Sequence, residues 1–192
     1  MAFDEEKGSG ADSTAKGSPP LKPGESPTIF TEEKNEVSPR ESRLAILLST
    51  GFGMGYCPFA PGTLGAALGV GIYYAVVNLS AHQVTLPLIS VALFFAGVYL
   101  SSAAEQRFQE KDPGKIVIDE IASFPLTMLF IPPSLTRIAI AFALNRAADI
   151  LKPFPAGRIQ KLRGGWGIML DDTIAAIYAN LLLRLLIVVL KI

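Results

Sequence analysis

Residues 164–172 read Gly-Gly-Trp-Gly-Ile-Met-Leu-Asp-Asp and lead into the apolar segment 173–192. Two adjacent carboxylates, Asp171 and Asp172, therefore stand at the border of an apolar segment. Such acids repel each other unless a cation neutralises them, and a divalent metal ion with oxygen ligands is the usual solution. The segment has the length of a membrane-spanning helix, and its Arg184 is compatible with a span or with a helix lying along the bilayer.

The composition divides the chain into two parts. It has 192 residues, half of them hydrophobic, and its 17 basic residues balance its 17 acidic ones. Residues 1–43 are polar and rich in Ser, Pro, Gly, Glu and Lys, so they cannot bury enough apolar surface to offset conformational entropy. We expect a disordered tail over 1–43, without a secretory signal, and one membrane-embedded domain over 44–192. The single cysteine, Cys57, excludes an intrachain disulfide.

The first long apolar runs predict helices. Segments 64–79 and 86–104 are of helix length, and the linker 80–83 between them contains no Lys or Arg. They are typical of a hairpin that spans a membrane, with its tip on the outer side. The basic residues that flank this pair predict that both of its ends lie on the cytoplasmic side.

Two shorter apolar runs follow, at 119–131 and 134–144, joined by Pro132-Pro133. Each is too short to cross a hydrocarbon core of about 30 Å. They form either one kinked span or a short, re-entrant helical hairpin. The next segment, 146–163, carries five basic residues, and this favours the hairpin, which returns the chain to the cytoplasmic side. The predicted fold is a small all-α bundle in a membrane.

This topology gathers acids at one membrane face. The carboxylates are those of Asp119, Glu120, Asp149, Asp171 and Asp172. As first-turn residues of helices, the two acidic pairs are also compatible with a purely structural role, because the helix dipole favours acids there. Their apolar surroundings favour a metal site formed by Asp119, Glu120, Asp171 and Asp172.

Candidate phosphate-binding groups lie near these acids. Arg146, Asp149 and Lys152 are spaced to share one helix face, either as an ion-pair ladder or with the two cations on a phosphate. A loop containing Gly164 and Gly165 would allow backbone N–H groups to approach a phosphate. Two further residues have alternative roles: Thr63 as a helix cap or a phosphate contact, and Arg158 as a phosphate contact or a lipid anchor.

Four segments of the chain, taken in order, resemble the signature segments of bacterial phosphatidylglycerophosphatase A. They are residues 51–65, 116–120, 146–155 and 164–172. The resemblance covers 44–192 and implies magnesium-dependent hydrolysis of phosphatidylglycerophosphate to phosphatidylglycerol, in phospholipid biosynthesis at the bacterial cytoplasmic membrane. It implies a lipid substrate and no nucleic-acid partner. The chain departs from the family pattern at Ser123, where glycine is usual, and at Asn145, where an aromatic residue is common.

The mechanism that we expect is metal-assisted hydrolysis by water. Mg²⁺ held by the four paired acids would polarise the phosphoryl oxygens, and Asp149 would orient the water. Arg146 and Lys152 would offset the developing charge. A covalent aspartyl-phosphate route remains open. Two other functions remain as alternatives: a CDP-alcohol phosphotransferase-like enzyme and a small cation-coupled transporter.

Overall fold

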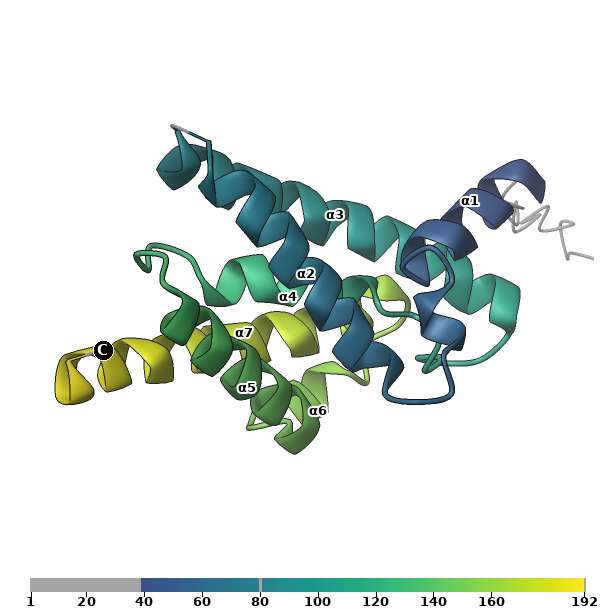
Figure 1. Cartoon of the computed structure of the whole chain (residues 1–192). Helices are drawn as coiled ribbons and strands as arrows, with labels where there is room; N and C mark the ends of the chain where they lie inside the picture. The colour runs from purple at the N-terminus through teal and green to yellow at the C-terminus, as the bar shows by residue number, and fades with distance from the viewer. Residues whose placement is uncertain (1–38, 80, 192) are drawn as a thin grey trace, which may run out of the picture. The chain divides into compact units, whose positions relative to one another are not determined.

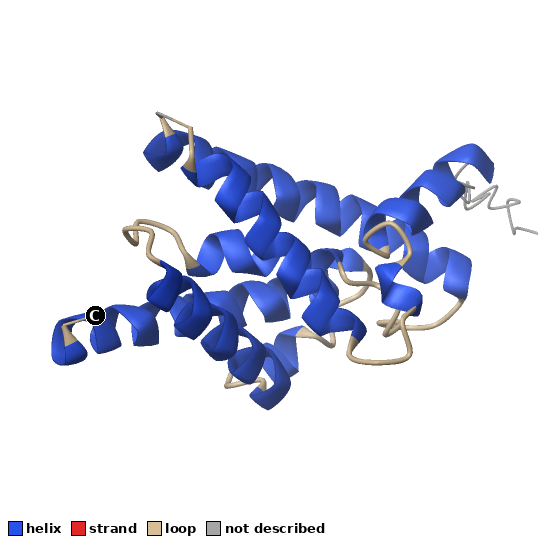
Figure 2. Ribbon diagram, in the orientation of Figure 1, coloured by secondary structure: helices blue, strands red, loops and turns tan. Residues whose placement is uncertain are grey.

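The computed structural model describes residues 39–79 and 81–191, which form helices joined by loops and contain no strand (Figures 1 and 2). The predicted all-α class is therefore confirmed. In chain order the elements are α1 (Pro39–Ser49), the short 3-10 helix η1 (Met54–Tyr56), α2 (Pro61–Val77), α3 (His82–Phe108), α4 (Ile118–Thr127), α5 (Leu135–Leu151), α6 (Ala156–Ile159) and α7 (Gly165–Leu190).

The predicted N-terminal tail falls mostly on residues 1–38, which lie outside the described part of the chain. Helix α1 begins at Pro39, so residues 39–43 of the predicted tail are helical.

The short helix α4 occupies the middle of the fold, between α2 and α7 (Figure 1). It packs against α2, α3, α5 and α7 and is buried over nearly its whole length. Phe124 and Met128 pack with Tyr73 and Leu183 in one hydrophobic cluster. The start of α4 belongs to a second cluster, which extends to Met169 of α7. Both clusters hold α4 in place, so its first turn is a rigid platform.

The predicted helical hairpin is confirmed. Asn145, near the end of α5, donates from Nδ2 to Ser123 Oγ at 2.9 Å and accepts from Thr127 Oγ1 at 3.0 Å. The chain therefore leaves along α4 and returns along α5. Helix α5 continues to Leu151, seven residues beyond the apolar run that predicted it, and so Arg146 and Asp149 are helical residues.

The C-terminal end of α4 is capped by side chains of α7. Asn180 Nδ2 donates to the carbonyls of Thr127 and Leu129 at 2.7 and 3.1 Å, and Arg184 Nη2 donates to Leu129 O at 2.8 Å. Helix ends leave carbonyls without intrahelical partners, and these need polar contacts in apolar surroundings. The Arg184 side chain is therefore hydrogen-bonded within the protein, at the C-terminal end of α4.

Among the described residues, two helices are long and apolar enough to cross a membrane: α3, with 27 residues, and α7, with 26. Both expose large apolar side chains, for example Phe95, Tyr99, Leu185 and Val188, as a membrane protein does. Helix α2 is apolar but has only 17 residues, or about 25 Å at 1.5 Å per residue. The first arm of the predicted spanning hairpin is thus shorter than a hydrocarbon core.

Candidate active site

The first turn of α4 presents Asp119 and Glu120. Its start is anchored by Val117, a fully buried residue whose N–H donates to Ser49 O at 2.8 Å. Asp119 is buried, and the Glu120 side chain is only 14% exposed. The sequence placed this pair at a helix start, and the structure confirms that position.

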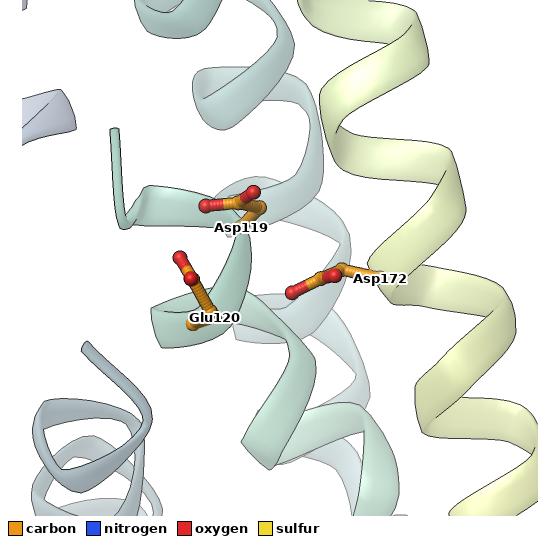
Figure 3. Close-up of side chains that lie close together, drawn as sticks. All are labelled: Asp119, Glu120 and Asp172. Carbon is orange, nitrogen blue, oxygen red and sulfur yellow. The ribbon is translucent and has the colours of Figure 1, made fainter. Parts of the chain in front are cut away.

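Asp172 approaches this pair from α7. One carboxylate oxygen from each of Asp119, Glu120 and Asp172 lies within 4.8 Å of the others, and Figure 3 shows the three side chains converging. We call these three residues the acid cluster. Asp172 was expected to open its helix, but α7 begins at Gly165, so Asp172 lies in the second turn. A structural role as a first-turn acid is therefore excluded for it.

The acid cluster has the chemistry of a cation site. Each member has a buried side-chain oxygen without a hydrogen-bond partner: Asp119 Oδ1, Glu120 Oε2 and Asp172 Oδ2. Burial, followed by the charge of Glu120, raises the pKa of Asp119 well above its usual range. Burial also raises the pKa of Glu120, although Asp119 and Arg146 partly oppose this. A cluster of buried carboxylates takes up either protons or a hard cation, because both relieve the repulsion between the acids. Three carboxylate oxygens at this spacing fit a divalent ion.

Arg146 lies beside the acid cluster. Its Nη1 is 2.8 Å from Asp149 Oδ2 and 4.0 Å from Glu120 Oε1, while its buried Nε has no hydrogen-bond partner. Asp149 also lies close to Asp172. Of the three residues predicted to share a helix face, Arg146 and Asp149 pair on α5 beside the acid cluster, whereas Lys152 is the residue that ends this helix. The unpaired Nε–H of Arg146 can donate to an anion, and the unpaired oxygens of the acid cluster beside it can bind a cation.

Asp171 and Lys152 form a separate pair. Lys152 Nζ lies 2.8 Å from Asp171 Oδ2, and this buried carboxylate is outside the acid cluster. Burial by itself lowers the pKa of Lys152, but the hydrogen bond and charge of Asp171 raise it above its usual value. The structure therefore brings together three of the four predicted metal ligands, and the fourth, Asp171, pairs with Lys152 instead.

The start of α2 closes one side of the site. A Cβ atom added to Gly62 would lie 2.2 Å from Glu120 Oε1 and 2.9 Å from Arg146 Nη2, so a larger residue there would displace the ends of these two side chains. Thr63 was a candidate helix cap, but the cap position is Ala60, which makes no side-chain cap. The backbone N–H of Thr63 donates to Ala60 O at 3.0 Å. The residue is exposed, so its hydroxyl remains a candidate contact for the substrate.

The glycines before Asp171 do not form the expected loop. Gly165 is the first residue of α7, and its N–H donates to Ser102 Oγ at 2.8 Å. A Cβ atom there would lie 2.1 Å from Val98 O, so this glycine is required where α7 packs closely against α3. Gly164 faces Ser102 as well, with a φ of 66°. Both glycines contact α3, and their predicted contact with phosphate has no geometric support in the structure.

Arg158 remains at the surface. Its guanidinium lies 4.9 Å from the centroid of the Phe154 ring, on the short helix α6 and the turn before it. This stacking agrees with either predicted role, because an exposed cation on an aromatic ring is free to meet a phosphate or a lipid head group.

A buried polar network behind the acid cluster was not predicted. Asn145 joins Ser123 and Thr127, as described above, and Ser123 Oγ also donates to Glu120 O at 3.0 Å. The network ties the first turn of α4 to the end of α5, which carries Arg146. A signal in the sequence could have indicated this network: Ser123 and Asn145 are polar residues in apolar helices, and both are among the positions at which the chain departs from the family pattern.

Comparisons with known proteins identify the family of the chain. Residues 47–187 match the phosphatidylglycerophosphatase A family. A Haemophilus influenzae protein named phosphatidylglycerophosphatase A is 43% identical over 136 residues, covering 69% of this chain and 82% of the relative. The Escherichia coli protein of the same name is 31% identical over 133 residues, covering 68% and 76%. A Bacteroides thetaiotaomicron protein named "Putative phosphatidylinositol-3-phosphatase" is 35% identical over 150 residues, covering 75% and 94%. No solved structure shows significant similarity to the chain.

The all-helical fold, its apolar helices and these relatives define a phosphatase with the features of a membrane protein. More specifically, the chain belongs to the phosphatidylglycerophosphatase A family, whose match covers most of its length.

Proposed function

We propose that this protein hydrolyses the terminal phosphomonoester of phosphatidylglycerophosphate, releasing phosphatidylglycerol and inorganic phosphate, with Mg²⁺ as its cofactor. The observation that carries the proposal is the acid cluster, whose three converging carboxylates each have an unpartnered buried oxygen. The names of the Haemophilus influenzae and Escherichia coli relatives support the substrate.

The residues divide the chemistry among them. Asp119, Glu120 and Asp172 would hold the ion, which when bound supplies positive charge toward the phosphoryl oxygens and lowers the pKa of water. The unpartnered Nε of Arg146 would donate to a phosphoryl oxygen. Asp149, which Arg146 holds at 2.8 Å, would orient the attacking water and accept its proton.

We also propose a location for this reaction. The phosphatase would be a multi-pass protein of the bacterial cytoplasmic membrane, with its active site on the cytoplasmic face. The support is the distribution of charge, because the segments that adjoin the acid cluster are rich in basic residues: Lys111, Lys115, Lys152, Arg158, Lys161 and Arg163. Short cytoplasmic loops carry such an excess of Lys and Arg.

A second substrate is suggested by one relative. The Bacteroides thetaiotaomicron protein carries a phosphatidylinositol-3-phosphatase name, and phosphatidylinositol 3-phosphate is also a lipid phosphomonoester. The acid cluster and Arg146 would act on the phosphate itself, so they suit either lipid. The two candidates differ in the head group, and the assay must therefore contain both.

The test uses purified protein in mixed micelles, with inorganic phosphate as the readout. We expect release from phosphatidylglycerophosphate that requires Mg²⁺ and is lost when a chelator is added. Faster release from phosphatidylinositol 3-phosphate would favour the second substrate. Release of CMP from a CDP-lipid would support the transferase alternative, and cation flux in liposomes without hydrolysis would support the transporter. Full activity of Asp172→Asn at limiting Mg²⁺ would overturn the assigned site.

A further inference from the structure

An apolar groove of about 450 Å³ lies between α5 and α7. The part formed by α5 includes Leu144, Ala147 and Leu151, and the part formed by α7 includes Tyr178 and Leu185. Only one lining residue, Tyr178, has a polar side-chain atom, and its hydroxyl donates to Phe154 O at 2.8 Å. The side chains that line the groove therefore suit hydrocarbon.

The groove lies beside the proposed reaction site, because α5 and α7, which line the groove, also carry Arg146, Asp149 and Asp172. Helix α5 carries Arg146 and Asp149 beside Ala147 and Ala148, and Lys152 follows Leu151. On α7 the groove begins at Tyr178, six residues after Asp172, or about 9 Å along the helix at 1.5 Å per residue. A gap of this size is comparable to the extent of a polar lipid head group.

We infer that this groove binds an acyl chain of the lipid substrate while the head-group phosphate lies at the acid cluster. The inference rests on the proposed function, because it takes the substrate to be a lipid phosphomonoester. Alanines at 147, 148 and 179 keep the groove open, since larger side chains would fill it. An acyl chain that enters the groove from a bilayer leaves surroundings that are already apolar, so its burial there adds little affinity. The groove therefore acts mainly by orienting the substrate.

The first experiment blocks the groove with Ala147→Phe. Ala147 is exposed and lines the groove, whereas Ala143, on the same helix, is exposed outside it, so Ala143→Phe is a matched control. The two substrates are phosphatidylglycerophosphate with long acyl chains, in micelles, and its water-soluble dihexanoyl analogue. We expect Ala147→Phe to lower kcat/KM for the long-chain substrate about tenfold and for the analogue less than about twofold.

Ala143→Phe should behave as the wild type with both substrates. Equal losses of kcat/KM on the two substrates in Ala147→Phe, in a protein that unfolds at the wild-type temperature, would overturn the inference. If the wild type hydrolyses neither lipid, the proposed function fails, and the groove is then judged by binding alone.

The binding experiment uses a phosphatidylglycerophosphate that carries a photoreactive diazirine at the end of one acyl chain. Cross-linking followed by peptide mapping should label the part of α7 between Tyr178 and Leu185 most strongly. Ala147→Phe should reduce this labelling about tenfold, while Ala143→Phe should leave it unchanged. Labelling spread evenly over the exposed apolar faces of α3 and α7 would show ordinary bilayer contact and overturn the inference.

Discussion

Lys152 Nζ lies 2.8 Å from Asp171 Oδ2, and this contact separates Asp171 from its neighbour Asp172. Successive residues of an α-helix point about 100° apart, so two adjacent acids in α7 face different partners. Asp172 joins Asp119 and Glu120, whereas Asp171 forms an ion pair with the end of α5. Asp171 and Asp172 have identical side chains, but their contacts in the structure suggest different roles for them.

The two acids should respond differently to removal of charge. Asp172→Asn removes one of three proposed ligands, and we expect it to raise the Mg²⁺ concentration for half-maximal phosphate release at least about tenfold. Asp171→Asn removes the partner of Lys152 instead, and it should change this concentration less than about threefold while lowering kcat. Titration of phosphate release with Mg²⁺ measures both quantities.

A direct binding measurement complements that titration. Mn²⁺ binding, followed by the paramagnetic signal of the free ion, should weaken in Asp172→Asn and remain close to wild type in Asp171→Asn. Equal weakening in both variants would return Asp171 to the ligand set and contradict the ion-pair assignment.

Arg146 should be intolerant of lysine. Its guanidinium lies between Asp149 and Glu120 and still has an unpartnered Nε, whereas a lysine ammonium is a single point charge and cannot repeat this geometry. We expect Arg146→Lys to lower kcat by about 10- to 100-fold. The matched control is Arg137→Lys on the same helix, where Arg137 donates to Pro132 O. A similar loss of kcat in both variants would indicate a general effect of shortening arginines on α5.

Gly62 should be required for activity rather than for stability. An alanine methyl group there would displace the Glu120 carboxylate, and we expect Gly62→Ala to reduce phosphate release about tenfold. Gly71 lies in the same helix, and nothing would lie within 4 Å of a Cβ atom there. Gly71→Ala should therefore keep full activity and gain about 0.5–1 kcal/mol of stability. Unchanged activity in Gly62→Ala would show that Glu120 can move without consequence.

Asn145 should contribute to the stability of the α4–α5 hairpin. Asn145→Leu removes two buried hydrogen bonds, and at about 1 kcal/mol each it should destabilise the protein by about 2 kcal/mol. Asn145→Asp has nearly the same shape but adds a buried charge close to other acids, so it should destabilise the protein more. Thermal unfolding in detergent compares the two variants. Greater stability of the aspartate variant would mean that this site is wetter than its burial indicates.

Much of the fold could be predicted from the chain. Apolar runs of helix length predicted α2, α3 and α7, and Pro132-Pro133 with the basic segment after it predicted the hairpin. The helix starts were harder to place. Glycines normally indicate a loop, but Gly165 is the first residue of α7. Its N–H donates to Ser102 Oγ, and its backbone packs directly against that of Val98 in α3. Tertiary contacts between α3 and α7 overrode the local preference of these residues.

The sequence by itself determined the helical class, the apolar surfaces and the list of acids from which a cation site could be built, because these follow from composition, periodicity and spacing. Only the tertiary structure decided which acids meet. Asp119, Glu120 and Asp172 converge because α4 is held between α2 and α7, while Asp171 turns toward Lys152. Distances between side chains on different helices depend on how those helices pack and rotate, and no pattern along a single helix contains that information.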